Sequence, residues 1–275
     1  MTEAADSRAT ATARADPGGV RAVSRALDLL QAFAPDRTSL SLAELVRATG
    51  LPRTTVLRLV DTLVAERMLQ HGSDGRIAVG TRLIRWGAFA GAAWTVPAAT
   101  SERMAALSAE TGETVSLYVR SGIRRVVIAQ SPSPHSLRHV VQVGDELPLW
   151  IGAAGSVLLA AETDDAIEST LDEVEAGRSG DDPAIDRDDV RSRVAGARRD
   201  GHAVSHGARE PGNSGVAVLV ADTAPPRRPH RAQPVVLAVG GPTSRFTEEA
   251  VARFVAALHE AAIDVDRSGL PPALG

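Results

Sequence analysis

The chain has 275 residues, a formal net charge of −4 at pH 7 and no cysteine. Its length exceeds what one compact domain usually needs and predicts two domains, while the missing cysteines exclude disulfides and thiolate metal sites; we expect no metal and no cofactor. Residues 1–19 lack the apolar run of a signal peptide and no stretch is apolar enough to span a membrane, so we expect a cytoplasmic protein without membrane contact.

Charge is divided unevenly along the chain. Residues 1–19 form a low-complexity segment that we expect to be a disordered tail. Between Val20 and Ala90, ten arginines stand against six carboxylates, whereas the rest of the chain is acidic. A basic head on an acidic body suits a protein that presents one end to phosphates, although chance clustering produces an excess of this size too.

The segment Ser41–Met68 predicts two short amphipathic helices joined by a tight corner. Ser41 and Glu44 have the spacing of a capping box at the start of the first helix. Gly50 can end that helix in the left-handed conformation, and Pro52 suits the start of the next one. The second helix then places Val56, Leu59, Val60 and Leu63 on one apolar stripe. This pattern favours a helix-turn-helix over the alternative, a pair of core helices in an ordinary helical domain.

The outer face of the second helix carries candidate DNA-contacting groups. Arginine can grip guanine with two hydrogen bonds, and threonine offers a hydroxyl and a methyl, in the half of this helix that enters the major groove. After it, Met68–His71 and Arg76–Val79 predict a β-hairpin, the wing of a winged helix-turn-helix, with Arg76 on the phosphate backbone. The predicted DNA-binding residues are Arg21, Arg25, Ser41, Arg53, Thr54, Thr55, Arg58, Thr62 and Arg76.

Residues 81–96 predict a helix that links the two halves and ends before Pro97. A helical linker transmits a change in domain orientation, whereas the alternative is a simple spacer. The expected organisation is a tail at 1–19, a winged helix-turn-helix domain at 20–80, the linker helix at 81–96 and an effector-binding domain at 97–270.

The second half alternates helices and strands, which predicts an α+β domain with a largely antiparallel sheet. We expect a helix to Thr111, helices near Gly155 and Asp188, and a last helix from Thr247; the expected strands are 114–120, 124–130, 137–143, 216–221 and 234–239. The acidic segment Asp172–Asp189 has no predicted shape. The proline-rich, basic segment Asp222–Pro234 is predicted to be a mobile surface insertion, with a partner-binding loop as the alternative.

A run of small residues, Gly152–Ser156, precedes an apolar helix, so backbone amides at that helix start can approach an anion. A small organic acid suits such a pocket, with a few polar groups from the strands that follow. The predicted effector-binding residues are Val115, Leu117, Ala153, Ala154, Gly155, Ser156, Ser205, Glu210 and Ser214. The alternative is that the small residues only allow close packing on a sheet.

An enzyme is the competing class of function. Gly212-Asn-Ser-Gly215 superficially resembles the serine motif of some hydrolases, with His202 and His206 nearby. A nucleophile needs a base within hydrogen-bond reach, which short spacing does not establish. The two histidines follow Gly201 in a predicted strand that spreads them apart, which argues against a metal site. We expect no enzymatic activity; a pure interaction module would leave the first half of the chain unexplained.

Separate blocks of the chain resemble the IclR family of bacterial transcriptional regulators. They are Val20–Leu30, Ser41–Glu44, Gly50–Val60, Val143–Leu149, Gly152–Ala160, Gly201–Val204 and Glu210–Gly212, in family order over roughly residues 20–266. The resemblance implies a GAF-like effector-binding domain and a homodimer, or a dimer of dimers, on double-stranded DNA with a palindromic operator. The implied function is a repressor or activator whose operator binding is modulated by a small organic acid.

Overall fold

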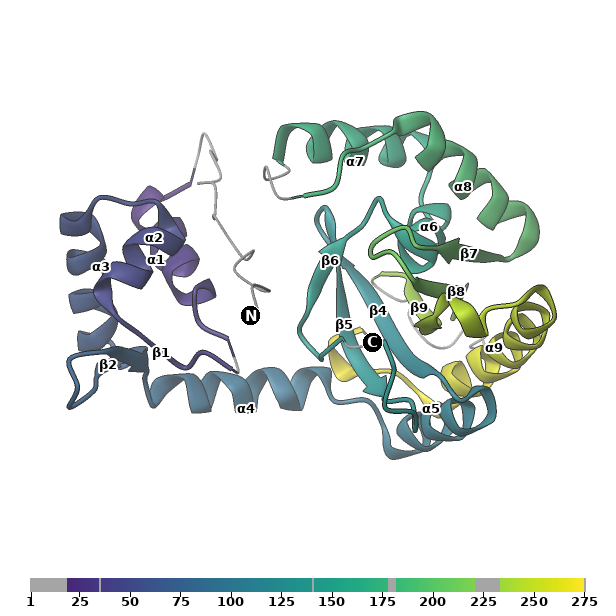
Figure 1. Cartoon of the computed structure of the whole chain (residues 1–275), viewed down its shortest axis with the longest axis horizontal. Helices are drawn as coiled ribbons and strands as arrows, with labels where there is room; N and C mark the ends of the chain where they lie inside the picture. Colours follow the sequence, from purple (N-terminus) through teal and green to yellow (C-terminus); the bar gives the residue numbers. More distant parts are fainter. Residues whose placement is uncertain (1–18, 35, 140, 178–181, 221–232, 275) are drawn as a thin grey trace, which may run out of the picture. The chain divides into compact units, whose positions relative to one another are not determined.

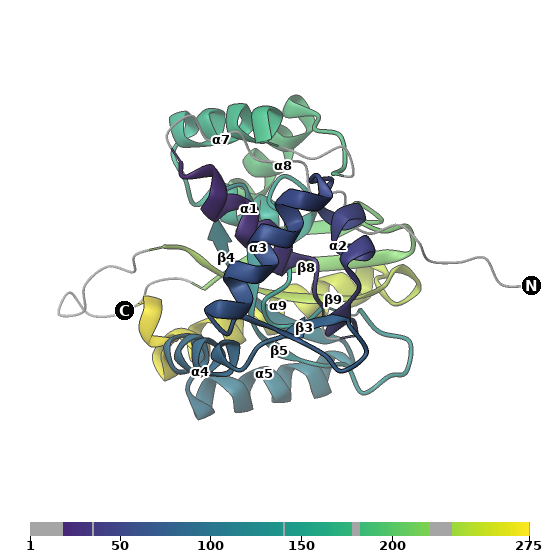
Figure 2. The same cartoon turned by 90° about the vertical axis from the view of Figure 1, so that its left-hand side faces the viewer.

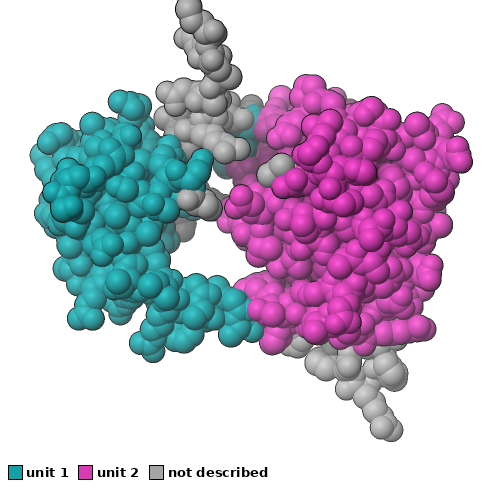
Figure 3. Space-filling view, turned by 60° about the horizontal axis from the view of Figure 1, so that its bottom comes forward, with its two compact units in different colours: residues 1–92, 177–182 teal, residues 93–176, 183–275 magenta. Residues whose placement is uncertain are grey.

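The computed structural model describes residues 19–34, 36–139, 141–177, 182–220 and 233–274. They form two compact units, and the main boundary between them along the chain lies at residues 92 and 93 (Figure 3). Each unit has its own apolar core. Every helix in these ranges is too short or too polar to cross a membrane.

Three helices and a small antiparallel sheet form the core of the first unit, which also includes most of the helix that follows the sheet (Figure 2). The helices are α1 (Arg21–Gln31), α2 (Leu42–Thr49) and α3 (Arg53–Ala65); the strands are β1 (Ser39–Leu40), β2 (Leu69–His71) and β3 (Ile77–Val79), in the order β1-β3-β2. Leucines and valines from all three helices and from the sheet share one core. The predicted helix-turn-helix and hairpin are therefore present, and β1 adds a strand that was not predicted.

A capping box at the start of α2 and a left-handed glycine at its end define the corner between α2 and α3. The Ser41 hydroxyl accepts a hydrogen bond from the amide of Glu44, whose carboxylate accepts one from the amide of Ser41 at 2.7 Å. This capping box starts α2. Gly50 ends the helix with φ of +64°, a conformation that glycine adopts without steric penalty. The two helices thus meet at a defined turn.

The helix α4 (Arg82–Trp94) occupies most of the predicted linker, and none of its residues is buried. Ile84, Trp86 and Phe89 expose more than half of their surface. The rings of Trp86 and Phe89 meet edge to face, and the Arg85 guanidinium lies 5.1 Å from the centre of the Phe89 ring. The helix therefore carries exposed apolar side chains within the described part of the chain.

The second unit is built on one six-stranded antiparallel sheet in the order β6-β5-β4-β9-β8-β7. Its strands are β4 (Thr114–Ser121), β5 (Arg124–Ser131), β6 (Glu146–Pro148), β7 (His202–His206), β8 (Asn213–Leu219) and β9 (Val235–Pro242). The helices are α5 (Ala98–Thr111), α6 (Gly152–Ala160), α7 (Asp164–Gly177), α8 (Arg187–Asp200) and α9 (Glu248–Ser268), with short 3-10 turns η1 (Thr243–Arg245) and η2 (Pro272–Leu274). The α+β architecture with an antiparallel sheet is confirmed.

Alternating side chains divide this unit into two cores, one on each face of the sheet. On β9, Val235, Leu237 and Val239 pack with α5 and α9, whereas Val236 and Ala238 pack with α6, α7 and α8. Figure 1 shows these two groups of helices on opposite faces. The helices α6, α7 and α8 therefore all pack on the same face of the sheet.

One expectation about this unit was wrong, one helix was not predicted, and one predicted segment lies largely outside the described residues. The described residues 137–139 and 141–143 form no strand, and β5 pairs instead with β6; Gln130 donates to the carbonyl of Val141. The helix α7 was not predicted, although Ile167, Leu171 and Val174 mark its buried face. Residues 221–232 of the predicted insertion are not described.

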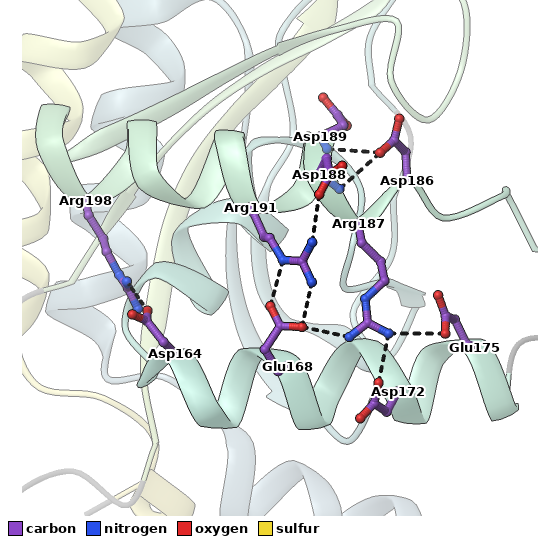
Figure 4. A network of polar contacts seen from close by, with 10 residues as sticks. All are labelled: Asp164, Glu168, Asp172, Glu175, Asp186, Arg187, Asp188, Asp189, Arg191 and Arg198. Atoms are coloured by element: carbon purple, nitrogen blue, oxygen red, sulfur yellow. Dashed lines mark hydrogen bonds and ion pairs between the residues drawn. The ribbon is translucent and has the colours of Figure 1, made fainter.

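Ion pairs join α7 to α8 across their exposed sides (Figure 4). Both Arg187 and Arg191 donate to the Glu168 carboxylate at 2.7 Å. Hydrogen bonds from Arg191 and, to a smaller extent, from Arg187 lower the pKa of Glu168 to about 2. Asp186 caps α8 by accepting hydrogen bonds from two amides of its first turn. The acidic segment Asp172–Asp189, for which no shape was predicted, therefore ends inside the first turn of α8.

Candidate functional site

The outer face of α3 presents the predicted groove-reading residues to solvent. Arg53, Thr54 and Arg58 are exposed, while Val56 and Val60 are buried against the rest of the first unit. The helix begins at Pro52 without a side-chain cap, so its first amides are open to an external acceptor such as a phosphate. This face combines two guanidiniums, hydroxyls and a helix N-terminus.

The remaining predicted contacts lie around this face at different depths. Arg21 is exposed at the start of α1 and Arg25 is partly buried one turn later. Thr55 is partly buried, and the exposed Thr62 donates its hydroxyl to the carbonyl of Arg58 at 2.8 Å. The Ser41 hydroxyl is engaged in the capping box. Their contacts with DNA stay predictions.

Arg76 occupies a different position from the one expected of a free phosphate contact. Its Nη2 donates to the Ser39 carbonyl and to the Glu44 carboxylate, both at 2.9 Å, and its Nε donates to the Ser39 hydroxyl. The guanidinium is therefore turned back from the hairpin onto the start of α2. Hydrogen bonds from Ser41, with a smaller contribution from the Arg76 charge, lower the pKa of Glu44. Arg76 thus links the wing to the start of α2, and its contact with the phosphate backbone stays a prediction.

The second unit contains a cavity of about 70 Å³ between the start of α6 and the strands β8 and β9. Small residues of the sheet leave this space, because Gly215, Ala238 and Gly240 present little or no side chain to it. The lining residues are Tyr118, Arg125, His139, Gly152, Ala153, Ala154, Ser205, Ala208, Arg209, Asn213, Ser214, Gly215, Ala238, Val239 and Gly240. Four predicted effector residues are among them: Ala153, Ala154, Ser205 and Ser214.

The other five predicted effector residues do not line the cavity. Val115 and Leu117 belong to the core under α5 and α9, so they face away from the cavity through the sheet. A Cβ atom on Gly155 would lie 2.0 Å from the Leu149 carbonyl oxygen, which shows that this glycine serves close packing. Ser156 donates to the Gly152 carbonyl inside α6, and Glu210 is exposed beside Arg209. Strand parity and close packing explain these corrections.

Five polar or aromatic lining residues were missed: Tyr118, Arg125, His139, Arg209 and Asn213. Arg125 had a sequence signal, since it occupies an inward position two residues before the fully buried Val127 of the same strand. The others come from loops or single strand positions that only the tertiary structure brings together.

His139 is held at the cavity by several contacts. The Thr114 hydroxyl donates to its carbonyl at 3.1 Å, and its ring contacts the Asn213 amide. The loop before it is anchored by Arg245, which pairs with the buried Glu113 and donates to the carbonyl of Leu137. Burial, followed by the charges of Arg209 and Arg125, lowers the pKa of His139 to about 4. The ring is therefore neutral at pH 7.

Hydroxyls complete the cavity near the start of α6. The Ser205 hydroxyl accepts a hydrogen bond from the Ala153 amide at 3.1 Å. The Ser214 hydroxyl lies 3.0 Å from Nδ1 of His206 and 2.9 Å from the Thr243 hydroxyl. Within the described ranges, no carboxylate pairs with His206, so the orienting acid of a hydrolase triad is missing there.

Comparisons with known proteins match both halves of the chain. The IclR helix-turn-helix domain matches residues 22–72, and the C-terminal domain of bacterial IclR transcriptional regulators matches residues 93–267. The transcriptional repressor IclR of Escherichia coli K12 is 26% identical over 260 residues, which cover 94% of this chain and 92% of the repressor.

Solved structures agree with these matches. An IclR-family regulator from Rhodococcus sp. is 38% identical, with a TM-score of 0.57 over 99% of this chain and 100% of that one. An IclR homologue from Microbacterium hydrocarbonoxydans, solved in complex with 4-hydroxybenzoate, is 22% identical and shares the fold, with a TM-score of 0.67 over 90% of this chain and 98% of that one.

The relatives are transcriptional regulators and not enzymes, which removes the support for a hydrolase. The family matches cover the helix-turn-helix and the cavity-bearing unit in the expected order. The chain therefore belongs to the IclR family of bacterial transcriptional regulators.

Proposed function

We propose that this regulator binds a palindromic operator through α3 and that a small organic acid in the cavity of the second unit modulates this binding. The observation that carries the DNA-binding part is the exposed Arg53, Thr54 and Arg58 on a helix whose opposite face is apolar and buried. Guanidiniums and threonines at the N-terminal half of a recognition helix suit base edges in the major groove. We place this activity in the cytoplasm, where bacterial DNA lies.

The effector part rests on the chemistry of the cavity. Two arginines, hydroxyls and the N-terminus of α6 surround it, and each of these favours an anion. The homologue from Microbacterium hydrocarbonoxydans was solved with an organic acid, 4-hydroxybenzoate, which supports the same class of ligand here. An effector can shift DNA affinity only by its difference in affinity between the two protein states, a coupling of about 1 to 3 kcal/mol in typical regulators.

We further propose that the regulator acts as a homodimer or a dimer of dimers in which α4 contributes to self-association. Ile84, Trp86 and Phe89 are exposed by 73%, 56% and 54%, an apolar surface that water disfavours. Two DNA-reading heads on a two-fold operator also multiply specificity, because one head makes few base contacts. Sedimentation of the full chain tests this: a monomer at micromolar concentration would contradict it.

Gel-shift titration of DNA from upstream of the protein's own gene tests the proposed function. Arg58→Ala should weaken binding by about 10- to 100-fold, in line with 1 to 3 kcal/mol for a lost base contact. Arg199→Ala is the matched control, because this arginine is also exposed but lies in the second unit beside Asp200. Equal affinities of the two variants would refute the assigned reading face, and unchanged affinity with short-chain and aromatic acids added would refute the effector part.

A further inference from the structure

Arg125 is a buried cation without an ionic partner in the described part of the chain. It is 5% exposed, and its Nη1 donates to the Ile151 carbonyl at 2.7 Å and to the Pro148 carbonyl. Its Nε has no hydrogen-bond partner. The nearest side-chain π system is Tyr118, whose ring centre lies 5.6 Å from the guanidinium carbon. Carbonyl dipoles and a ring solvate the cation, but none of them neutralises it.

The neighbouring charges make this imbalance larger. Arg193 and Arg209 act on Arg125 as like charges, and each has a carboxylate of its own: Asp189 lies 2.9 Å from Arg193, and Glu210 lies 3.4 Å from Arg209. Burial is the main cause that lowers the pKa of Arg125 to about 10, so the group stays protonated at pH 7. An uncompensated buried charge is costly, which leaves the site short of one negative charge.

The cavity places other anion-binding groups beside this cation. A Cβ atom added to Gly152, the first residue of α6, would lie 3.7 Å from both Nη2 of Arg125 and the Ser205 hydroxyl. The N-terminus of α6 carries a partial positive charge, and the Ser205 hydroxyl accepts from its Ala153 amide, which leaves the hydroxyl proton for an external acceptor. Across the cavity, the buried Oδ1 of Asn213 also has no partner.

We propose that Arg125 selects the ligand of this cavity, and that the ligand is a compact carboxylate whose charge neutralises this guanidinium. The inference deepens the proposed effector role of the same cavity and rests on it. A volume of about 70 Å³ is well below the roughly 300 Å³ at which pockets for drug-sized ligands begin, so the acid has only a few non-hydrogen atoms. The unpartnered Oδ1 of Asn213 is an acceptor, so it suits a hydroxyl or another donor on the same small molecule and not its carboxylate oxygens.

Thermal unfolding of the full chain at constant ionic strength tests the inference. Sodium pyruvate should raise the unfolding midpoint with increasing concentration, because a ligand that binds only the folded state stabilises it. Methyl pyruvate, of similar shape but uncharged, and sodium sulfate should not. Arg125→Met should weaken the response to pyruvate by about 30-fold or more, as expected when one side of a buried charged hydrogen bond is removed.

Two variants control for the loss of charge and for folding. Arg124→Met removes the same charge one residue earlier on β5. Arg124 is not among the lining residues and lies over the Trp150 ring, so this variant should respond to pyruvate like the wild type. Arg125→Lys keeps the charge but loses the planar fork, so it should retain a weakened response. If Arg125→Met does not fold, two other measurements test the inference: the response of the wild type to pyruvate against methyl pyruvate, and the response of Arg125→Lys to pyruvate.

The outcomes separate this inference from the proposed function. A wild-type response of Arg125→Met, equal stabilisation by the ester or sulfate, or stabilisation by 4-hydroxybenzoate without any by pyruvate would overturn it. If pyruvate binds through Arg125 but leaves operator affinity unchanged, the ligand assignment holds and the regulatory proposal fails.

Discussion

The helices α3 and α6 both begin beside arginines, yet they lie in opposite surroundings. Arg53 and Arg58 of α3 are exposed, and only the inner stripe of that helix is buried. In α6, the first eight residues are all buried, and the nearby guanidinium of Arg125 comes from another strand. In the function that we propose, the same combination of a helix N-terminus and guanidiniums therefore binds a polymer of phosphates in one unit and a small acid in a cavity in the other.

This comparison shows how burial sets the ligand class. Exposed arginines on α3 can follow an extended polyanion and are screened by salt. The buried Arg125 near α6 suits the small anion that we propose as the ligand of the cavity.

Gly155→Val should destabilise the second unit by more than about 3 kcal/mol, because its Cβ atom would overlap the Leu149 carbonyl oxygen. Thermal unfolding measured by circular dichroism checks this. The control is Gly196→Ala in the interior of α8, where the new Cβ meets only the end of the Arg199 side chain at 3.7 Å, and where alanine should stabilise. If Gly155→Val unfolds like the wild type, α6 is not packed as tightly as the contrast with α3 requires.

Lowering the pH should destabilise the cavity through His139. Its folded pKa of about 4 lies below the ordinary 6.5, so the unfolded chain takes up a proton first as the pH falls. Stability is then lost between pH 6.5 and about 4, by about 3 kcal/mol in total. Denaturant titrations of the wild type and of His139→Gln, which cannot titrate, should diverge over this range. If the stability of the two proteins changes with pH in the same way, the His139 ring is in contact with water, like the exposed side chains of α3.

Arg76→Met should have the smallest effect and separates a clamp from a phosphate contact. We expect a slightly lower unfolding midpoint, because the half-exposed contacts to Ser39 and Glu44 are lost. The salt dependence of operator binding should stay as in the wild type. If the slope of log affinity against log salt concentration is smaller by about one in the variant, Arg76 contacts a phosphate.

The sequence alone determined the first unit closely, because its signals are local. A capping box, a left-handed glycine and an apolar stripe each act within a few residues, so Ser41, Gly50 and the spacing of Val56 and Val60 suffice to place two helices and a turn. The exposed face of α3 follows directly, since whatever is not on the stripe points outward. Arg76 escaped prediction because its partners lie more than 30 residues away.

The cavity was decided by tertiary structure, because α6 is apolar on all sides and has no face that periodicity can assign. The family blocks located its beginning, and Ala153 and Ser205 do line the space. Which strand residues face it depended on strand parity, which placed Tyr118 inside and Val115 and Leu117 outside. The charge of the site came from Arg125. Its burial without a counter-ion among the described residues exists only once the sheet, the start of α6 and the loops around them are assembled.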